Sequence, residues 1–164
     1  MSQSILSLYR RMARWPAGRW LFARAVCFKA PYFGTIAPRF LRLEPGRCEI
    51  EIRDRRRVHN HLGSVHAIAL CNLAELAAGL MTDASLPPTL RWIPKGMTVE
   101  YLAQARGTMH AVATADIEVI DAGHGYELPV SVLVSDPSGA AVARARITMW
   151  VSPRPARNRA PSQP

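Results

Sequence analysis

The chain has 164 residues, of which 49% are hydrophobic and 20% are charged, a composition typical of a single globular domain that can bury a sizeable core. Its formal net charge of +9 is unevenly distributed: eight Lys or Arg residues precede the first acidic residue, Glu44, whereas ten basic and twelve acidic residues lie between Glu44 and Val151. A nucleic-acid-binding domain usually carries its positive charge on the folded body, so this class of protein is disfavoured.

The cysteines and the N-terminal segment bear on where the protein resides. Cys27, Cys48 and Cys71 are far apart and form no Cys-x-x-Cys or Cys/His ligand spacing, which favours a reducing compartment and predicts a cytoplasmic protein. No stretch approaches the ~18 uninterrupted apolar residues of a membrane-spanning helix. The N-terminal segment lacks the pattern of a secretory signal, although its acid-free, Arg-rich composition is also that of a mitochondrial transit peptide.

Residues 3–14 and 17–29 predict two short amphipathic helices, separated at Pro16 and ended before Pro31. Arginines lie on one side of these helices, and Leu, Trp, Phe and Val residues lie on the other. We interpret residues 1–38 as an N-terminal helical extension. Core packing explains most amphipathic helices, so a lid packed on its own domain is the favoured interpretation, with a helix pair on a membrane surface as the alternative.

The rest of the chain shows the two-residue alternation of half-buried strands. After a turn at residues 44–46, Cys48, Ile50 and Ile52 alternate with charged residues. Four further alternating runs follow, at residues 97–101, 109–119, 130–134 and 141–151. The turns that separate them lie at residues 104–107, 121–125 and 136–139. Short links favour antiparallel hairpins, so we expect a meander of strands within a domain of residues 39–152, followed by a disordered basic tail of residues 153–164.

A polar turn that begins at Asn60 leads into a long apolar helix, predicted from about Ser64 to Met81. Glu75 is the only carboxylate in this helix. A helix that is apolar nearly all round must be wrapped on most sides, so its single ionisable group is either a paired structural charge or a functional one. The order of elements predicts an α+β fold, in which an antiparallel sheet curls around the helix and pairs with a second copy of the chain.

This arrangement is the hotdog fold, and several residues resemble those of a known family with that fold. Asn60 precedes His66, which is followed by a small residue and, eight positions after that residue, by Glu75 in a Leu-Ala-Glu-Leu-Ala context. The pattern resembles the hotdog-fold thioesterase superfamily, in particular the phenylacetate-pathway and four-hydroxybenzoyl-CoA thioesterase-like proteins and a branch of uncharacterised bacterial hotdog proteins. The similarity in layout extends over residues 40–151.

The resemblance implies an enzyme that hydrolyses the thioester of an acyl-CoA. In the family, an Asn in the turn and the backbone N–H after the His hold the thioester, and the acid on the helix attacks it or activates water. The corresponding residues here are Asn60, Ala67 and Glu75, with His66 beside them. Ala67 stands where the family usually has Gly, and its N–H remains a usable donor if the local φ is negative.

Thioester hydrolysis needs a polarised carbonyl and a nucleophile or base. The helix N-terminus, near Ser64 to Ala67, favours the negative oxygen that develops, and Glu75 in an apolar setting suits the second task. Ala67 and Glu75 lie about 12 Å apart along the helix axis, so we expect the site to form between the subunits of a homodimer or a homotetramer built as a dimer of dimers. The alternatives are a structural Glu75, held by Asn72 or by a polar group of the partner subunit, and an Asn60 that only shapes the turn or caps the helix.

The sequence also contains candidate ligands for a metal and for the phosphates of coenzyme A. His59, His61 and His66 lie close together, but no carboxylate or Cys stands at the matching spacing, so we expect no metal and no cofactor beyond the coenzyme A of the substrate. Two sets of basic residues are candidates for binding its phosphates: Arg91, Lys95 and Arg106, and the run Arg55-Arg56-Arg57. Charge runs are most often solvated faces, which is the alternative interpretation of both sets.

Two other classes of function remain open. The same groove could hold a fatty-acyl chain or an acyl-CoA without turning it over, which would make the chain a binding protein. Residues 3–29 could instead hold the protein at a membrane surface as a peripheral contact. The sequence contains neither a phosphate-cradling Gly-rich loop nor a Ser nucleophile elbow.

Overall fold

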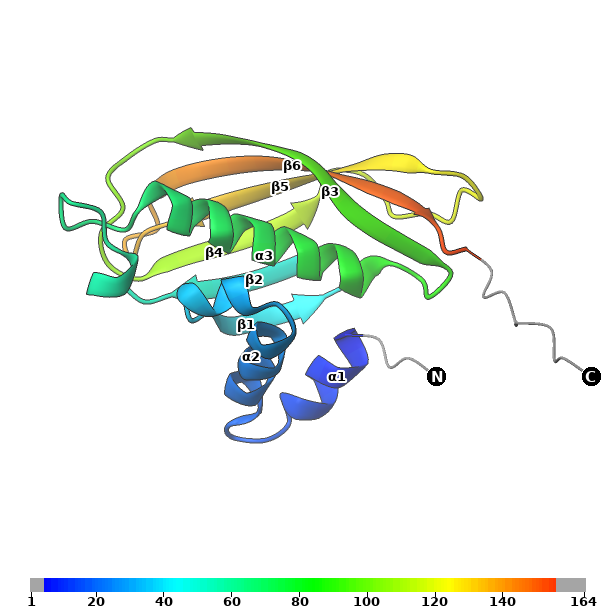
Figure 1. Ribbon diagram of the computed structural model, residues 1–164, viewed down its shortest axis with the longest axis horizontal. Coiled ribbons are helices and arrows are strands. Elements are labelled where there is room, and N and C mark those ends of the chain that lie inside the picture. Colours follow the sequence, from blue (N-terminus) through cyan, green and yellow to red (C-terminus); the bar gives the residue numbers. More distant parts are fainter. Residues whose placement is uncertain (1–4, 156–164) are drawn as a thin grey trace, which may run out of the picture.

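The computed structural model describes residues 5–155, which form one curved sheet packed on a central helix (Figure 1). The elements in chain order are α1 (Ile5–Met12), α2 (Gly18–Lys29), the short 3-10 helix η1 (Pro31–Thr35), β1 (Arg39–Glu44), β2 (Arg47–Ile52), the 3-10 helix η2 (Arg56–Val58), α3 (Ala67–Ser85), β3 (Leu90–Tyr101), β4 (Met109–Ala115), β5 (Tyr126–Ser135) and β6 (Ala141–Pro153).

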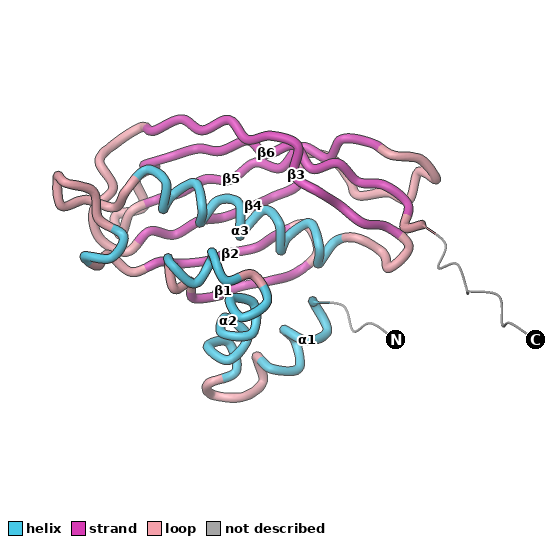
Figure 2. The backbone as a smooth tube through the Cα atoms, in the orientation of Figure 1, coloured by secondary structure: helices cyan, strands magenta, loops and turns pink. Residues whose placement is uncertain are grey.

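The strands of the described residues form a single antiparallel sheet in the order β1-β2-β4-β5-β6-β3. The sheet curls around α3, and β1 and β3 are its two edges (Figures 1 and 2). The predicted α+β hotdog architecture, with helices preceding it, is therefore confirmed.

The side-chain alternation does not predict β1, because this strand is irregular. Its register against β2 shifts between Phe40 and Arg42. The shift lets Phe40 and Leu43 both face the core although they are three residues apart. A similar shift in β3, between Pro94 and Gly96, conceals the first half of that strand from the two-residue period.

The expectation of a continuous meander is wrong at one link. Residues 102–108 join β3 to β4, yet these strands do not pair: β4 pairs with β2, and β3 crosses to the far edge and pairs with β6. The link is held instead by the segment before α3, where the N–H of Val65 donates to the carbonyl of Ala105 at 2.9 Å. A short link therefore does not guarantee a hairpin when a neighbouring segment satisfies its backbone groups.

The central helix begins and ends later than the sequence predicts. Val65 forms an antiparallel bridge with His59, so the chain is still extended there and the helix begins at Ala67. At the other end, the hydroxyls of Thr82 and Ser85 donate to carbonyls one turn earlier, at 2.8 and 2.7 Å, and the helix continues through Ser85. By length and composition α3 could span a membrane, but it is largely a core helix, with 61% of that apolar window buried.

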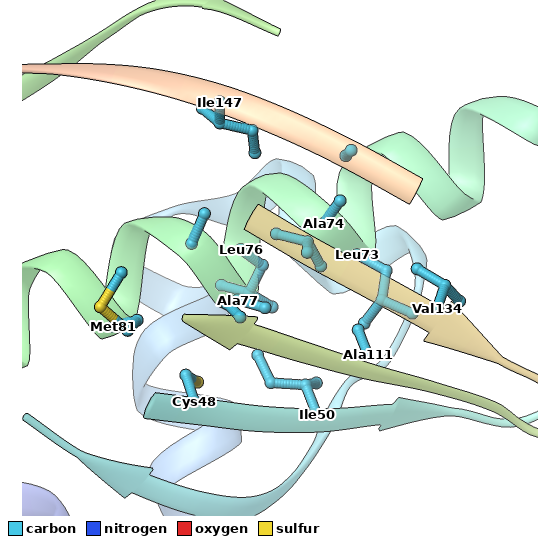
Figure 3. Packing of buried hydrophobic residues seen from close by; sticks show 14 of the residues in the cluster. Cys48, Ile50, Leu73, Ala74, Leu76, Ala77, Met81, Ala111, Val134 and Ile147 are labelled. Carbon is cyan, nitrogen blue, oxygen red and sulfur yellow. The ribbon is translucent and has the colours of Figure 1, made fainter. Parts of the chain in front are cut away.

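The core lies between α3 and the concave face of the sheet (Figure 3). Leu73, Leu76, Ala77 and Met81 of α3 pack against side chains of four strands, among them Ile50, Ala111, Val134 and Ile147. Burying a Leu or Ile side chain contributes about 1.5–3 kcal/mol, so this contact dominates the attachment of α3 to the sheet.

The N-terminal helices pack on the β1 edge. Phe22 of α2 makes edge-to-face contacts with Tyr9 of α1 and Phe40 of β1, with ring centroids 5.1 and 4.9 Å apart. The hydroxyl of Tyr9 donates to the carbonyl of Leu41 at 3.3 Å. One side of the extension is therefore part of the core.

The C-terminal end of the sheet extends slightly beyond the expected domain boundary. Pro153 closes β6, and Arg154 donates from its Nε to the carbonyl of Leu90 at 2.7 Å. The start of the segment predicted to be disordered is thus held to β3. The remainder of that segment, residues 156–164, and residues 1–4 of the extension lie outside the described residues.

Candidate functional site

A tight turn at residues 60–64 precedes α3, and the side chain of Asn60 shapes it. The Oδ1 atom of Asn60 accepts from the N–H groups of Leu62, at 2.9 Å, and Ser64, at 3.2 Å. Its Nδ2 donates to the Oγ of Ser64 at 3.0 Å. Gly63 closes the turn at a φ of +71°, a conformation that favours glycine. The turn-shaping interpretation of Asn60 therefore has direct support. Within residues 5–155, the Nδ2 of Asn60 donates only to Ser64, so one of its two N–H groups is left for another partner.

The first turn of α3 presents an unpaired backbone donor. His66 is the N-cap residue, and its Nδ1 accepts the N–H of Ile68 at 3.0 Å, so its side chain caps the helix. The N–H of Ala67 has no partner among the residues that the structure describes. Ala37 is the one described non-glycine residue with a positive φ, so the φ of Ala67 is negative and its N–H is a usable donor.

Glu75 lies on a stripe of α3 that the sheet leaves uncovered. Ile68, Cys71 and Glu75 follow one another along this stripe at helical spacing, and Ile68 is 55% exposed. The expectation that α3 is wrapped on nearly all sides is wrong here, because Glu75 is exposed within a single chain rather than in an apolar setting. Among residues 5–155, no group forms a hydrogen bond or an ion pair with Glu75.

Asn72 does not hold Glu75. It is buried on a neighbouring face of α3, where its Nδ2 donates to the Oγ1 of Thr35 at 3.1 Å. That alternative interpretation of Glu75 is therefore wrong. The Oδ1 of Asn72 is buried and has no partner among the described residues, which leaves an acceptor beside the helix start.

Contacts with β3 determine which part of α3 is exposed to solvent. Trp92 packs on the helix at Gly79, where an added Cβ would lie 2.8 Å from the Cη2 of the indole. Farther along β3, the hydroxyl of Tyr101 lies 3.1 Å from the Sγ of Cys71. This hydrogen bond, together with burial, raises the pKa of Tyr101 to about 12, so the phenol is un-ionised at neutral pH. Between these two contacts the carboxylate of Glu75 remains open.

A pocket of about 200 Å³ lies beside the start of α3. Three segments that are distant in sequence line it: η1 and the residue after it, the η2 region, and the first turns of α3. Its polar residues are Tyr32, Thr35, Arg57, His59, His66 and Asn72. The N-terminal extension therefore contributes to the site, which the sequence patterns did not indicate because η1 meets α3 only through tertiary contacts.

The sequence patterns also do not single out Asp54. Its side chain joins the two segments that flank the start of α3. Its Oδ1 pairs with the Nε2 of His59, and its Oδ2 accepts the N–H of Gly107 at 2.6 Å. The hydrogen bond with His59, and after it that with Gly107, lower the pKa of the Asp54 carboxyl against the opposing effect of partial burial. The only sequence feature that could have identified Asp54 is its place as a single carboxylate just after a predicted strand and within a run of arginines.

The candidate phosphate-binding residues do not form one cluster within the chain. Arg91 and Lys95 lie on the half of β3 that packs on the end of α3, and Lys95 pairs with Glu127 at 2.7 Å. Arg106 lies in the link next to Gly107, beside the turn. The run of residues 55–57 lies at η2. Only Arg106 and this run are therefore near the helix start in one chain.

The outer edge of β3 is unpaired among the described strands. Its exposed apolar side chains are Ile93, Met97 and Tyr101, with exposed fractions of 59%, 38% and 51%. An edge strand with exposed backbone groups and apolar side chains is suited to pairing with another strand.

Comparison with known proteins places this fold among relatives. The profile of a family described as Domain of unknown function (DUF4442) matches residues 18–151. No match is found among curated proteins. A crystal structure from structural genomics is 45% identical, with a TM-score of 0.78, and the likeness covers 92% of this chain and 99% of that one.

Two further solved structures are similar to this chain. A Pseudomonas aeruginosa protein of unknown function, described as a probable thioesterase, is 25% identical, with a TM-score of 0.73 and coverage of 82% of this chain and 95% of that one. A thioesterase from Haemophilus influenzae is 14% identical, with a TM-score of 0.70 and coverage of 82% and 90%, which shows a likeness in fold alone.

Proposed function

This chain belongs to the family described as Domain of unknown function (DUF4442), within the hotdog-fold thioesterase superfamily, and on that premise we propose that it hydrolyses the thioester of an acyl-CoA. One observation carries the proposal: α3 presents the N–H of Ala67 and, on its uncovered stripe, the carboxylate of Glu75, and neither has a partner within residues 5–155. These are the donor for an oxyanion and the base or nucleophile that the reaction requires.

In the proposed reaction, the N–H of Ala67 and the positive end of the α3 dipole stabilise the negative charge that develops on the thioester oxygen. Glu75 removes a proton from water, whose oxygen attacks the carbonyl carbon. The tetrahedral intermediate then collapses, the C–S bond breaks, and the leaving coenzyme A sulfur takes up the proton, which gives a carboxylic acid and free coenzyme A.

The alternative course uses Glu75 as the nucleophile. Its carboxylate attacks the thioester carbon and displaces the thiolate to form a mixed anhydride, which water opens to the same products. In either course Asn60 positions the turn. Because the Nδ1 of His66 accepts the N–H of Ile68, the proton of the neutral ring lies on Nε2, where it can donate to the substrate.

The site requires a second copy of the chain. About 12 Å along the α3 axis separates Ala67 from Glu75, so one carbonyl cannot contact both within a chain. Antiparallel pairing of two β3 edges joins the sheets and sets one subunit's Glu75 against the partner's turn, with two sites in each dimer. The same pairing brings Arg91 and Lys95 towards the partner's link around Arg106, where they can bind the phosphates of coenzyme A. A homotetramer that is built from two such dimers would contain the same sites.

The location we propose is the cytoplasm. Cys27, Cys48 and Cys71 are all free, and a reducing compartment keeps them so. Burial raises the pKa of the Cys48 thiol, which makes it unreactive.

The first experiment measures hydrolysis of a panel of acyl-CoAs by the wild type and by Glu75→Gln. The variant should lose activity by orders of magnitude while it still binds the same acyl-CoA. The matched control is Glu118→Gln, which changes an exposed carboxylate beyond β4. A wild type that binds acyl-CoA but hydrolyses none of the panel would favour the alternative function, binding without turnover.

Mixed dimers test where the two groups come from. Ala67→Pro and Glu75→Gln chains, coexpressed with different tags and purified as mixed dimers, contain one doubly changed site and one intact site if each site uses both subunits. About half of the wild-type activity should then return, although each homodimer is inactive. Inactive mixed dimers would show that the two groups act within one subunit.

A further inference from the structure

The outward side of the α1–α2 hairpin carries aromatic and basic side chains that the core does not use. We call this surface the basic–aromatic face, and it consists of Arg10, Arg11, Arg14, Trp15, Trp20, Leu21, Arg24 and Phe28. Its four arginines form no ion pair with any of residues 5–155. No acidic residue precedes Glu44 in the sequence, so the face has no internal countercharge nearby in the chain.

Helix α2 carries large hydrophobic side chains on two opposite sides. Packing within the chain explains the burial of only one of these sides. Phe22, Ala23 and Val26 are buried against α1 and β1. Trp20, Arg24 and Phe28 follow at four-residue steps on the opposite side, where Trp20 is 63% and Phe28 is 91% exposed. The lid interpretation of the extension is therefore correct for one side of α2. The expected separation of arginines from Trp and Phe is wrong for this helix, because Arg24 lies between Trp20 and Phe28 on its exposed side.

Helix α1 adds a concentrated positive charge. Arg10, Arg11 and Arg14 line, with Leu6 and Ser7, a hollow of about 300 Å³. Guanidinium groups bind phosphate oxygens by paired hydrogen bonds, so three of them around one hollow suit a phosphate-bearing surface. Trp15, which is 71% exposed, follows directly in the connection to α2.

The position of the hairpin leaves this face free for a partner. The hairpin lies along the β1 edge, at the opposite side of the sheet from β3, and the connection between its helices projects away from the sheet (Figure 1). Pairing of two β3 edges therefore does not cover it.

We propose that the basic–aromatic face docks the protein on the surface of a membrane that contains anionic phospholipids. Trp side chains favour the boundary between lipid headgroups and acyl chains, and arginines beside them bind headgroup phosphates. Exposed Trp and Phe side chains next to arginines, with no acidic residue on the same segment, suit an anionic lipid surface, where the rings lie among the headgroups while the arginines contact phosphate. The inference does not depend on hydrolysis of acyl-CoA.

Vesicle sedimentation tests the proposal with the full chain. Vesicles of phosphatidylcholine with phosphatidylglycerol should bind the wild type about tenfold or more tightly than vesicles of phosphatidylcholine alone, and added salt should weaken this binding. Arg10→Gln combined with Arg14→Gln should remove the preference for anionic lipid. Trp15→Ser combined with Trp20→Ser should weaken binding about tenfold at every salt concentration.

The matched control combines Ile120→Ser with Arg144→Gln, which change an exposed apolar and an exposed basic residue outside the hairpin, and it should bind as the wild type does. Far-ultraviolet circular dichroism shows that each variant is folded. Failure of the folded wild type to sediment with anionic vesicles at low salt would overturn the proposal. Variants of the face that change the oligomeric state in light scattering, without any effect on vesicle binding, would assign the face to a second copy instead and would also overturn it.

Discussion

The carboxylate of Asp54 accepts a hydrogen bond from the backbone N–H of Gly107 at 2.6 Å. Its other oxygen pairs with His59, the residue directly before the turn that leads to α3. One side chain thus ties the end of β2 to the link after β3 and to the approach to the turn. The placement of the Ala67 N–H, which we propose as the oxyanion donor, depends on this frame, because such a donor must be held within a fraction of an ångström.

Asp54→Asn should lower the free energy of unfolding by about 1–3 kcal/mol near neutral pH, since a charged acceptor is lost. The bonds from His59 and Gly107 hold the folded-state pKa of Asp54 below the unfolded value, near 3.9. The stabilisation is therefore fully present above about pH 4 and is lost as the pH falls through the lowered folded-state pKa. Denaturant unfolding of both proteins across this range should show a constant gap that closes in acid. A gap that widens on acidification would contradict the assignment.

Ala67→Pro removes the proposed oxyanion donor with little change to the helix. Proline suits the first helical position, and His66 before it has the extended conformation, with φ −65° and ψ 140°, that proline requires of its predecessor. We expect kcat to fall about 10²–10³-fold, with the free energy of unfolding changed by less than about 0.5 kcal/mol. Ala67→Gly keeps the N–H and should lose far less. Retained activity in the proline variant would exclude this N–H from the mechanism.

The parts of the fold that follow regular periods could be predicted from the sequence. β2 alternates cleanly because every second residue packs on α3, and α3 itself is marked by its apolar length. β1 was missed because the shift between Phe40 and Arg42 breaks that period. The crossing of β3 to the far edge could not be predicted, since strand pairing depends on contacts distant in sequence, such as that between Val65 and Ala105.

In the candidate site, too, features that follow a regular period could be predicted, and features that depend on contacts distant in sequence could not. The position of Glu75 on α3 follows from the helical period, and the place of His66 at the start of the helix follows from the polar turn before it. The exposure of Glu75 does not follow, because it depends on where Trp92 of another element stops covering the helix. The pocket could not be predicted either, since Thr35 and Asn72 meet only after folding.

Substitutions of Asn60 separate its role in the turn from contact with substrate. Asn60→Asp keeps the oxygen that accepts from Leu62 and Ser64, so we expect a stable protein with kcat and KM within a few-fold of the wild type. Asn60→Ala removes this oxygen and should cost about 1 kcal/mol of stability, with a larger loss of activity as the turn loosens. Thermal unfolding and steady-state kinetics measure both effects. A stable aspartate variant with a large rise in KM would place the amide N–H of Asn60 on the substrate.

Met97→Asp tests whether the edge of β3 builds the site. Met97 is 38% exposed in the single chain and becomes buried when two β3 edges pair, where an unpaired carboxylate is strongly unfavourable. We expect the variant to remain folded but to be monomeric in light scattering, and to lose hydrolysis together with the dimer, because each turn then lacks the partner's carboxylate. Leu133→Asp, at a 45% exposed position on β5, is the control and should at most separate a dimer of dimers. A monomeric Met97→Asp variant with full kcat would contradict a site that is shared between two subunits.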